Sequence, residues 1–169
     1  MAITLALCLE ILQQAEGYTH YDEFQEALLK IDDVVSAACH KVGKRVVTFA
    51  ETYQNEKLFY TISSGASFGH AYGFAICSLM EMQWLDASAI HSGEFFHGPF
   101  EVTDKHTNFI VLVNEGRTRP LDLRVLAFLK RYAKNYVVID ARELGIDVLP
   151  ESVVEFFNPV LFYGVLCEY

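Results

Sequence analysis

Four short apolar runs, rich in β-branched and aromatic residues and separated by longer segments, constrain the fold more than any other feature of this sequence. They span residues 58–62, 87–91, 108–113 and 136–140. Continuous apolarity is typical of strands that are buried on both faces of a parallel sheet. Strands that alternate with helices predict a parallel sheet with helices on both sides, joined by right-handed crossovers. We therefore expect a three-layer α/β/α fold with four or five parallel strands.

Two helical segments are expected before the first strand. Residues 2–15 carry apolar side chains on two rows, one of which holds Ile3, Leu7 and Ile11. A helix that is apolar nearly all round is buried on several sides, which indicates a partner, either a second subunit or a preceding portion of chain. Residues 22–51 have helical periodicity, with Gly43 as a candidate break. We expect an N-terminal helical segment over residues 1–55 and an α/β subdomain over residues 56–169.

A loop rich in serine and glycine follows the first strand. It contains Ser63, Ser64, Gly65 and Ser67 and leads into a helix expected around residues 70–83. Backbone N–H groups at such a helix start can bind an anion or a polar ligand. A tight turn that needs glycine for its geometry alone would give the same pattern. Both interpretations stay open, and the four residues are candidate substrate contacts.

Two further helices are expected in the second half of the chain. Residues 120–133 begin with a proline, which suits a first helical turn. Residues 151–169 read as one very apolar helix, with Pro159 near its start or at a kink. The chain stops at Tyr169 without a helix stop signal. We therefore expect that it was cut from a longer chain.

Composition excludes several classes of partner. The formal net charge of −9 makes nucleic acid a poor partner, because phosphate backbones need a basic surface. The cysteines Cys8, Cys39, Cys77 and Cys167 lack ligand spacing, so we expect reduced thiols and no metal. No segment approaches the ~20 apolar residues of a membrane span, and no basic leader precedes the apolar start. These features predict a cytoplasmic protein that does not bind membranes.

The segment Glu94-Phe95-Phe96-His97-Gly98-Pro99 carries a family resemblance. It resembles the E-x-K/F-x-H-G-P pattern of the aldose–ketose isomerase branch of the sugar isomerase (SIS) family. Glu81, sixteen positions before His97, matches the spacing of the catalytic glutamate and histidine of that branch. The sequence around both residues is closer to that of the fructosamine-6-phosphate deglycases than to that of the isomerase domain of glucosamine-6-phosphate synthase. The resemblance covers roughly residues 59–169.

The resemblance implies a flavodoxin-like SIS subdomain that processes a phosphorylated sugar or sugar-amine. It implies that Glu81 is the base that moves a proton between C1 and C2, and that His97 is an acid–base group. The products would be glucose 6-phosphate and an amine or amino acid, and no cofactor is implied. Full-length relatives carry two SIS subdomains, and this chain resembles the second only. A homodimer, or association with another SIS subdomain, is therefore implied.

Less specific interpretations of the same residues stay open. Glu81 could be a solvated carboxylate at a helix end, and His97 could be a turn histidine that bonds to backbone. The chain could then be a non-catalytic module that binds a phosphosugar, or an aldose–ketose isomerase domain. Glu94 is expected to cap a short helix. Three arginines are expected on a solvated face, from which one could reach an anion: Arg117, Arg119 and Arg124.

Overall fold

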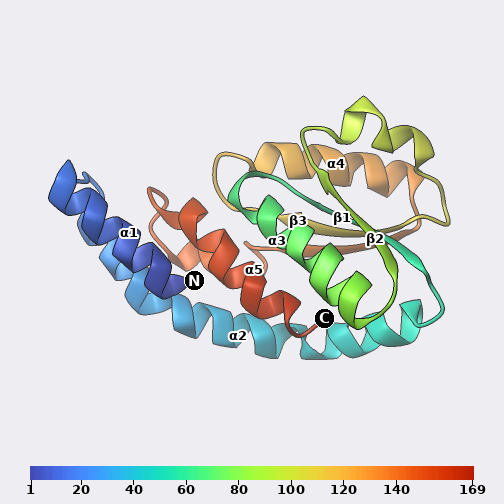
Figure 1. Cartoon of the computed structure of the whole chain (residues 1–169), viewed down its shortest axis with the longest axis horizontal. Coiled ribbons are helices and arrows are strands. Elements are labelled where there is room, and N and C mark those ends of the chain that lie inside the picture. Colours follow the sequence, from blue (N-terminus) through green and yellow to red (C-terminus); the bar gives the residue numbers. More distant parts are fainter.

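The computed structural model describes all of residues 1–169 and has a four-stranded parallel sheet at its centre (Figure 1). The strands are β1 (Leu58–Ser63), β2 (Asp86–His91), β3 (Asn108–Val113) and β4 (Asn135–Asp140), in the spatial order β2-β1-β3-β4. Every neighbouring pair is parallel. Each predicted run agrees with a strand to within one residue at either end. The expected α/β sheet is confirmed.

Helices cover both faces of this sheet. On one face lie α2 (Tyr21–Tyr53), α3 (Phe68–Gly73) and α5 (Asn158–Leu166), and on the other lies α4 (Arg119–Tyr132) (Figure 1). All six residues of β3 are buried, and the five apolar ones alternate between two clusters. Ile110 and Leu112 join the cluster that contains α2 and α5, whereas Val111 packs with α4. This explains why β3 is apolar without alternation: both of its faces are core.

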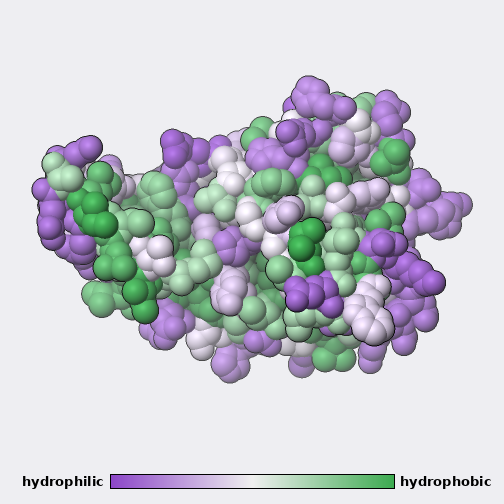
Figure 2. Space-filling model, viewed as in Figure 1, coloured by the Kyte–Doolittle hydropathy of each residue, from purple (hydrophilic) through white to green (hydrophobic).

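The first two helices form a long arm. Helix α1 (Ala2–Ala15) packs on α2 and buries only Leu9 fully. The row of Ile3, Leu7 and Ile11 is exposed, with the Ile3 side chain at 78%. It forms a hydrophobic patch at one end of the molecule (Figure 2). Helix α2 runs unbroken for 33 residues, so the expected break at Gly43 is wrong. One glycine costs only about 1 kcal/mol in a helix, and the neighbouring Val42 is fully buried in the core.

The end of the chain differs from the single helix expected over residues 151–169. The chain first passes through turns and the 3₁₀ segment η6 (Val154–Phe157), and α5 spans only Asn158–Leu166. Pro159 lies in the first turn of α5, where its missing N–H breaks no helical hydrogen bond. The proline therefore starts this helix, because an N–H-deficient residue is tolerated there and not in a helix interior.

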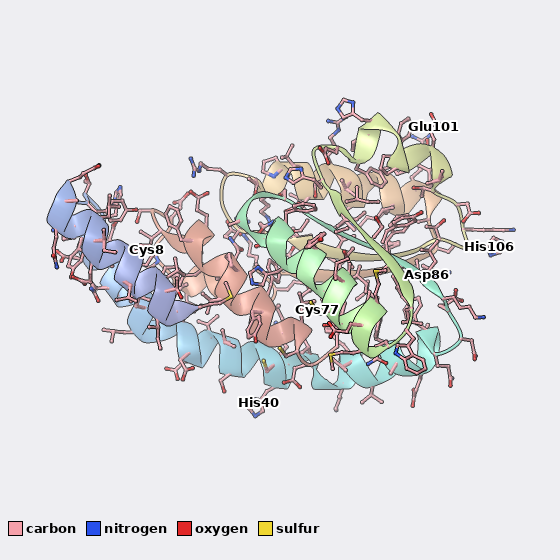
Figure 3. All side chains as sticks on the ribbon, in the orientation of Figure 1. Cys8, His40, Cys77, Asp86, Glu101 and His106 are labelled. Carbon is pink, nitrogen blue, oxygen red and sulfur yellow. The ribbon has the colours of Figure 1, made fainter.

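The helix after the serine loop also differs from a regular α-helix. After α3 it continues as a π-helical segment, η2 (Phe74–Met82). The segment ends at Met82, and Trp84, two residues further on, has a positive φ of 58°. The four cysteines are free, with Cys8 on α1 and Cys77 on η2 (Figure 3). No helix combines the length and the apolarity needed to cross a bilayer.

The outer edge of the sheet at β4 has a polar contact. The guanidinium group of Arg45, on α2, donates a hydrogen bond of 2.5 Å from Nη2 to the carbonyl oxygen of Val138. Helix α2 therefore both packs on the sheet and satisfies an acceptor of its edge strand.

Candidate functional site

A crevice opens at the carboxyl edge of the sheet, where the strand order reverses. After β1 the chain moves to β2 on one side, and β3 then lies on the other side of β1. The loops that follow β1 and β3 therefore diverge, and ligands of open α/β sheets bind at such switch points. A cavity of about 320 Å³ lies there. Its walls come from these two loops and the segment before α5, and include Gly65, Ala66, Asn114, Glu115, Arg117 and Thr118.

The serine loop forms one wall of this crevice. Gly65 has φ +54°, and a Cβ there would lie 2.8 Å from Oγ1 of Thr118, so this position requires glycine. Ser63 and Ser64 are fully buried, and their hydroxyls donate to the carbonyl oxygens of Leu112 and Thr118, each at 3.3 Å. The tight-turn interpretation therefore accounts for these three residues.

Ser67 differs from the other serines of the loop. It is fully buried, yet its Oγ has no hydrogen-bond partner. It is the last residue of the 3₁₀ turn η1 (Gly65–Ser67), which runs directly into α3, and the backbone N–H of Phe68 already donates to the carbonyl oxygen of Gly65. Buried hydroxyls are normally hydrogen-bonded, so Ser67 stands out within the loop, although it does not line the cavity beside Gly65 and Ala66.

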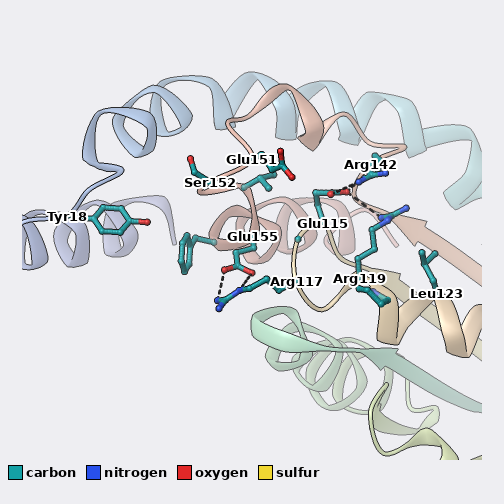
Figure 4. Close-up of a pocket in the computed structure, with 13 residues that line it drawn as sticks. Tyr18, Glu115, Arg117, Arg119, Leu123, Arg142, Glu151, Ser152 and Glu155 are labelled. Atoms are coloured by element: carbon teal, nitrogen blue, oxygen red, sulfur yellow. Dashed lines mark hydrogen bonds and ion pairs between the residues drawn. The ribbon is translucent and has the colours of Figure 1, made fainter.

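Ion pairs line the wider mouth of the crevice, a cavity of about 800 Å³ (Figure 4). Arg142 contacts both carboxylate oxygens of Glu115 at 2.6 and 2.7 Å, and Arg117 pairs with Glu155 at 2.6 Å. The hydrogen bond from Arg142 is the main cause that lowers the pKa of Glu115. Both arginines already have carboxylate partners, so a ligand anion would have to compete for them.

The predicted solvated face holds for Arg117 but is wrong for Arg119. The Arg119 side chain is only 14% exposed, and its guanidinium group makes two hydrogen bonds of 2.8 Å to the carboxylate of Asp140. A bidentate pair of this kind is rigid and strong. It joins the start of α4 to the end of β4 and supports the rim of the crevice.

The structure separates Glu81 from His97 within one chain. Glu81 is exposed near the end of η2, a few residues before β2 begins, whereas His97 is exposed beyond the end of β2, in η3 (Phe95–His97). The two therefore lie at opposite ends of β2, a strand of six residues, and strands of that length span ~17–20 Å. Figure 3 labels Asp86, at the start of β2, and Glu101, beyond its end, and the two lie apart in that view. Neither Glu81 nor His97 lines one of the main cavities.

The serine loop and the segment that leads to His97 both begin at the carboxyl edge of the sheet. The backbone N–H of Ser92 donates to the carbonyl oxygen of Ser63 at 2.8 Å, and the ring of His91 packs edge-on against Phe68 at 5.2 Å. Glu94 stands before η3 but makes no side-chain capping bond, so its expected capping role is wrong. The Glu94 side chain is exposed, and the segment that follows it is a single 3₁₀ turn.

Sequence reasoning missed several residues of the crevice. Asn114, Glu115 and Arg142 follow the ends of β3 and β4 directly. The signal that could have found them is their position, because side chains just after parallel strands meet at the carboxyl edge. No group of three or more histidine, cysteine, aspartate or glutamate side chains is placed to hold a metal ion.

The chain is similar to known deglycases and phosphosugar isomerases. The fructosamine deglycase FrlB of Bacillus subtilis is 39% identical over 158 residues, which cover 94% of this chain and 48% of that protein. A fructoselysine 6-phosphate deglycase of Escherichia coli K12 is 32% identical over 93 residues, which cover 55% of this chain and 27% of that protein. The crystal structure of a proposed phosphosugar isomerase from Salmonella typhimurium LT2 matches with a TM-score of 0.93 and 48% identity, over 96% of this chain and 50% of that chain.

The chain thus spans about half the length of the relatives that it matches most fully. No protein-family model matches it. The fold expected from the sequence and the likeness expected from the Glu81–Pro99 segment are both confirmed.

Proposed function

We propose that this chain is a unit of the sugar isomerase family, corresponding to about half of a full-length relative, and that it takes part in deglycating a fructosamine 6-phosphate. The observation that carries the proposal is the 39% identity to a fructosamine deglycase over 94% of this chain. The products are glucose 6-phosphate and an amine or amino acid. We place the protein in the cytoplasm, with a phosphorylated sugar-amine as its substrate.

The proposed reaction rearranges two protons and breaks one C–N bond. In the open-chain ketosamine, a base takes a proton from C1 and returns it to C2, while the C2 carbonyl oxygen gains a proton and the nitrogen loses one, which gives a C2 hydroxyl and a C1 imine. Water then hydrolyses the C1 imine to an aldehyde, and the amine leaves with its proton restored. Glu81 is the proposed base, and His97 is the proposed group that protonates the leaving nitrogen, since an imidazole exchanges protons near neutrality.

The phosphate end of the substrate is proposed to bind at the serine loop. The hydroxyl of Ser67 is the donor of this loop that no protein acceptor occupies, and it adds no net charge. Ser63, Ser64 and Gly65 shape the loop, because their polar groups are already occupied or their backbone requires the turn.

A complete site is proposed to need two SIS units. Glu81 and His97 lie at opposite ends of β2, so one copy of this chain cannot bring both to one substrate. A homodimer, or association with another SIS subdomain, can place the Glu81 of one unit beside the His97 of another. The exposed apolar row of α1 supports such an association, because contiguous exposed apolar side chains mark interaction surfaces.

The test is turnover of fructoselysine 6-phosphate by the purified chain, followed as glucose 6-phosphate through a coupled dehydrogenase. Glu81→Gln and His97→Ala should each lower kcat by ~10²–10⁴-fold without loss of fold. The matched controls are Glu94→Gln and His106→Ala, which make the same chemical changes at exposed positions and should leave kcat unchanged. Wild-type protein that binds a phosphosugar without turning it over would instead support the non-catalytic module.

A further inference from the structure

A buried carboxylate that the proposed proton transfers do not use connects three strand ends. Asp122 lies in the first turns of α4 and is fully buried. Its Oδ1 accepts a hydrogen bond of 2.6 Å from the hydroxyl of Ser92. Its Oδ2 accepts two from Asn114, one from the backbone N–H at 3.0 Å and one from the side-chain amide at 2.8 Å. The carboxylate therefore has three donors and no cationic partner among them.

Asn114 passes this connection on to the serine loop. The same side-chain amide that contacts Asp122 also lies 3.1 Å from the carbonyl oxygen of Ser64 and 3.2 Å from Oγ of Ser63. Ser64 opens the loop that leads to Ser67, three residues further along. Movement of Asn114 would therefore disturb the loop that carries the unpartnered Ser67 hydroxyl.

Ser92 passes the connection on to the histidine segment. It is the first residue after β2, and five residues later the chain reaches His97. Its hydroxyl is held by Asp122 and its backbone N–H by Ser63. The Asp122 carboxylate thus holds the residues at which the serine loop and the His97 segment begin.

A charge buried at this point is not required by core packing alone. Replacing buried charges with apolar residues of similar volume is often neutral or stabilising. The cost of burying the Asp122 carboxylate is met by three hydrogen bonds and by the positive end of the α4 dipole. What an apolar residue could not supply is the directional hold on Ser92 and Asn114.

We propose that Asp122 is a positioning residue, which sets the serine loop and the His97 segment at a fixed spacing across the carboxyl edge of the sheet. The inference rests on the proposed function for its catalytic meaning, although the positioning itself can be measured without turnover. The class of ligand that it serves is a phosphorylated open-chain sugar, with its phosphate at the loop and its amine-bearing end toward His97.

Backbone hydrogen exchange measured by mass spectrometry tests the positioning directly. In Asp122→Ala, amides of residues 63–67 and 92–97 should exchange about tenfold or more faster than in wild-type protein, because the buried donors lose their common acceptor. Asp122→Asn keeps the shape and one acceptor oxygen, so its rates should lie between the two. If the alanine variant does not fold, the asparagine variant decides.

The matched control is Val125→Ala, on the same helix and equally buried but with apolar contacts only. It should lower the melting temperature without a selective effect on the two segments. Equal exchange profiles in the Asp122 and Val125 variants would overturn the proposal.

Kinetics separate the two arms of the connection. Asn114→Ala should raise KM for the phosphosugar more than it lowers kcat, because it releases the serine loop. Ser92→Ala should lower kcat more than it raises KM, because it releases the His97 segment. Identical changes in both variants would refute separate positioning. An inactive wild-type protein whose exchange pattern still depends on Asp122 would count against the proposed function only.

Discussion

Two inactive variants of this chain should restore each other's activity when they are mixed. Glu81 lies at one end of β2 and His97 at the other, so a shared site needs one residue from each of two copies. In a dimer formed from one Glu81→Gln chain and one His97→Ala chain, one site carries both substitutions and the other site carries neither. Neither variant alone can assemble an intact site.

The size of the recovery follows from this geometry. Random exchange of subunits makes half of the dimers mixed, and each has one intact site of two, so activity should reach about a quarter of the wild-type value in a symmetric dimer. Each variant alone should lose ~10²–10⁴-fold. The mixture should therefore exceed either variant by about 25-fold or more, given the lower of those losses.

The assay needs a denaturation and refolding step, or slow exchange at low concentration, to let subunits mix. Native mass spectrometry of differently tagged chains confirms that mixed dimers form. Glu94→Gln mixed with His97→Ala serves as the control and should show half of the wild-type activity if the sites act independently. Mixed dimers that form in full but recover no activity would refute a site built across two copies.

Three further outcomes follow from the crevice and the core. Arg142 lowers the pKa of Glu115 in the folded chain, so this pair stabilises the fold above the unfolded pKa of about 4.3. The stabilisation is lost as pH falls through the lower pKa of the folded state. In Glu115→Gln, the melting temperature should therefore fall less steeply as pH is lowered. Gly65→Ala should cost about 1–3 kcal/mol from both strain and contact, and more than Gly145→Ala, whose added Cβ meets nothing within 4 Å; urea unfolding of both variants, with equal losses, would contradict the steric argument. Leu112→Ala should cost about 2–5 kcal/mol, since this side chain of β3 is buried in the core on the α2 and α5 side of the sheet. A loss below that range in the same assay would mean that the core collapses around the gap.

The strands could be predicted from sequence because each is a short apolar run with little ambiguity of period. Residues 108–113 show this most clearly: the predicted bounds and those of β3 agree at both ends. The extent of the final helix could not be predicted, because the apolar residues of 151–157 lead into α5 without a Gly or Pro before Pro159, and tertiary packing, rather than propensity, decides that they form turns. A glycine such as Gly43 is a weak break when the helix around it packs along its whole length.

The candidate site was predictable only in part, for a topological reason. Motif spacing places Glu81 and His97 near each other in sequence, but a strand lies between them and carries them apart. Asn114 and Asp122 gave no motif at all, since their importance depends on which strand ends become neighbours. The strand order β2-β1-β3-β4 supplies that information, and the sequence does not state it.

The hydrogen bond from Arg45 to the β4 carbonyl has a consequence for behaviour in concentrated solution. An edge strand with free acceptors is a template on which a foreign strand can add, and a charged side chain placed there blocks such growth. The guanidinium group occupies an acceptor on β4, whereas at the opposite edge β2 begins with the exposed carboxylate of Asp86. Neutralising both positions would leave a parallel sheet with two unguarded borders, and fibrils or amorphous precipitate would then compete with the folded state.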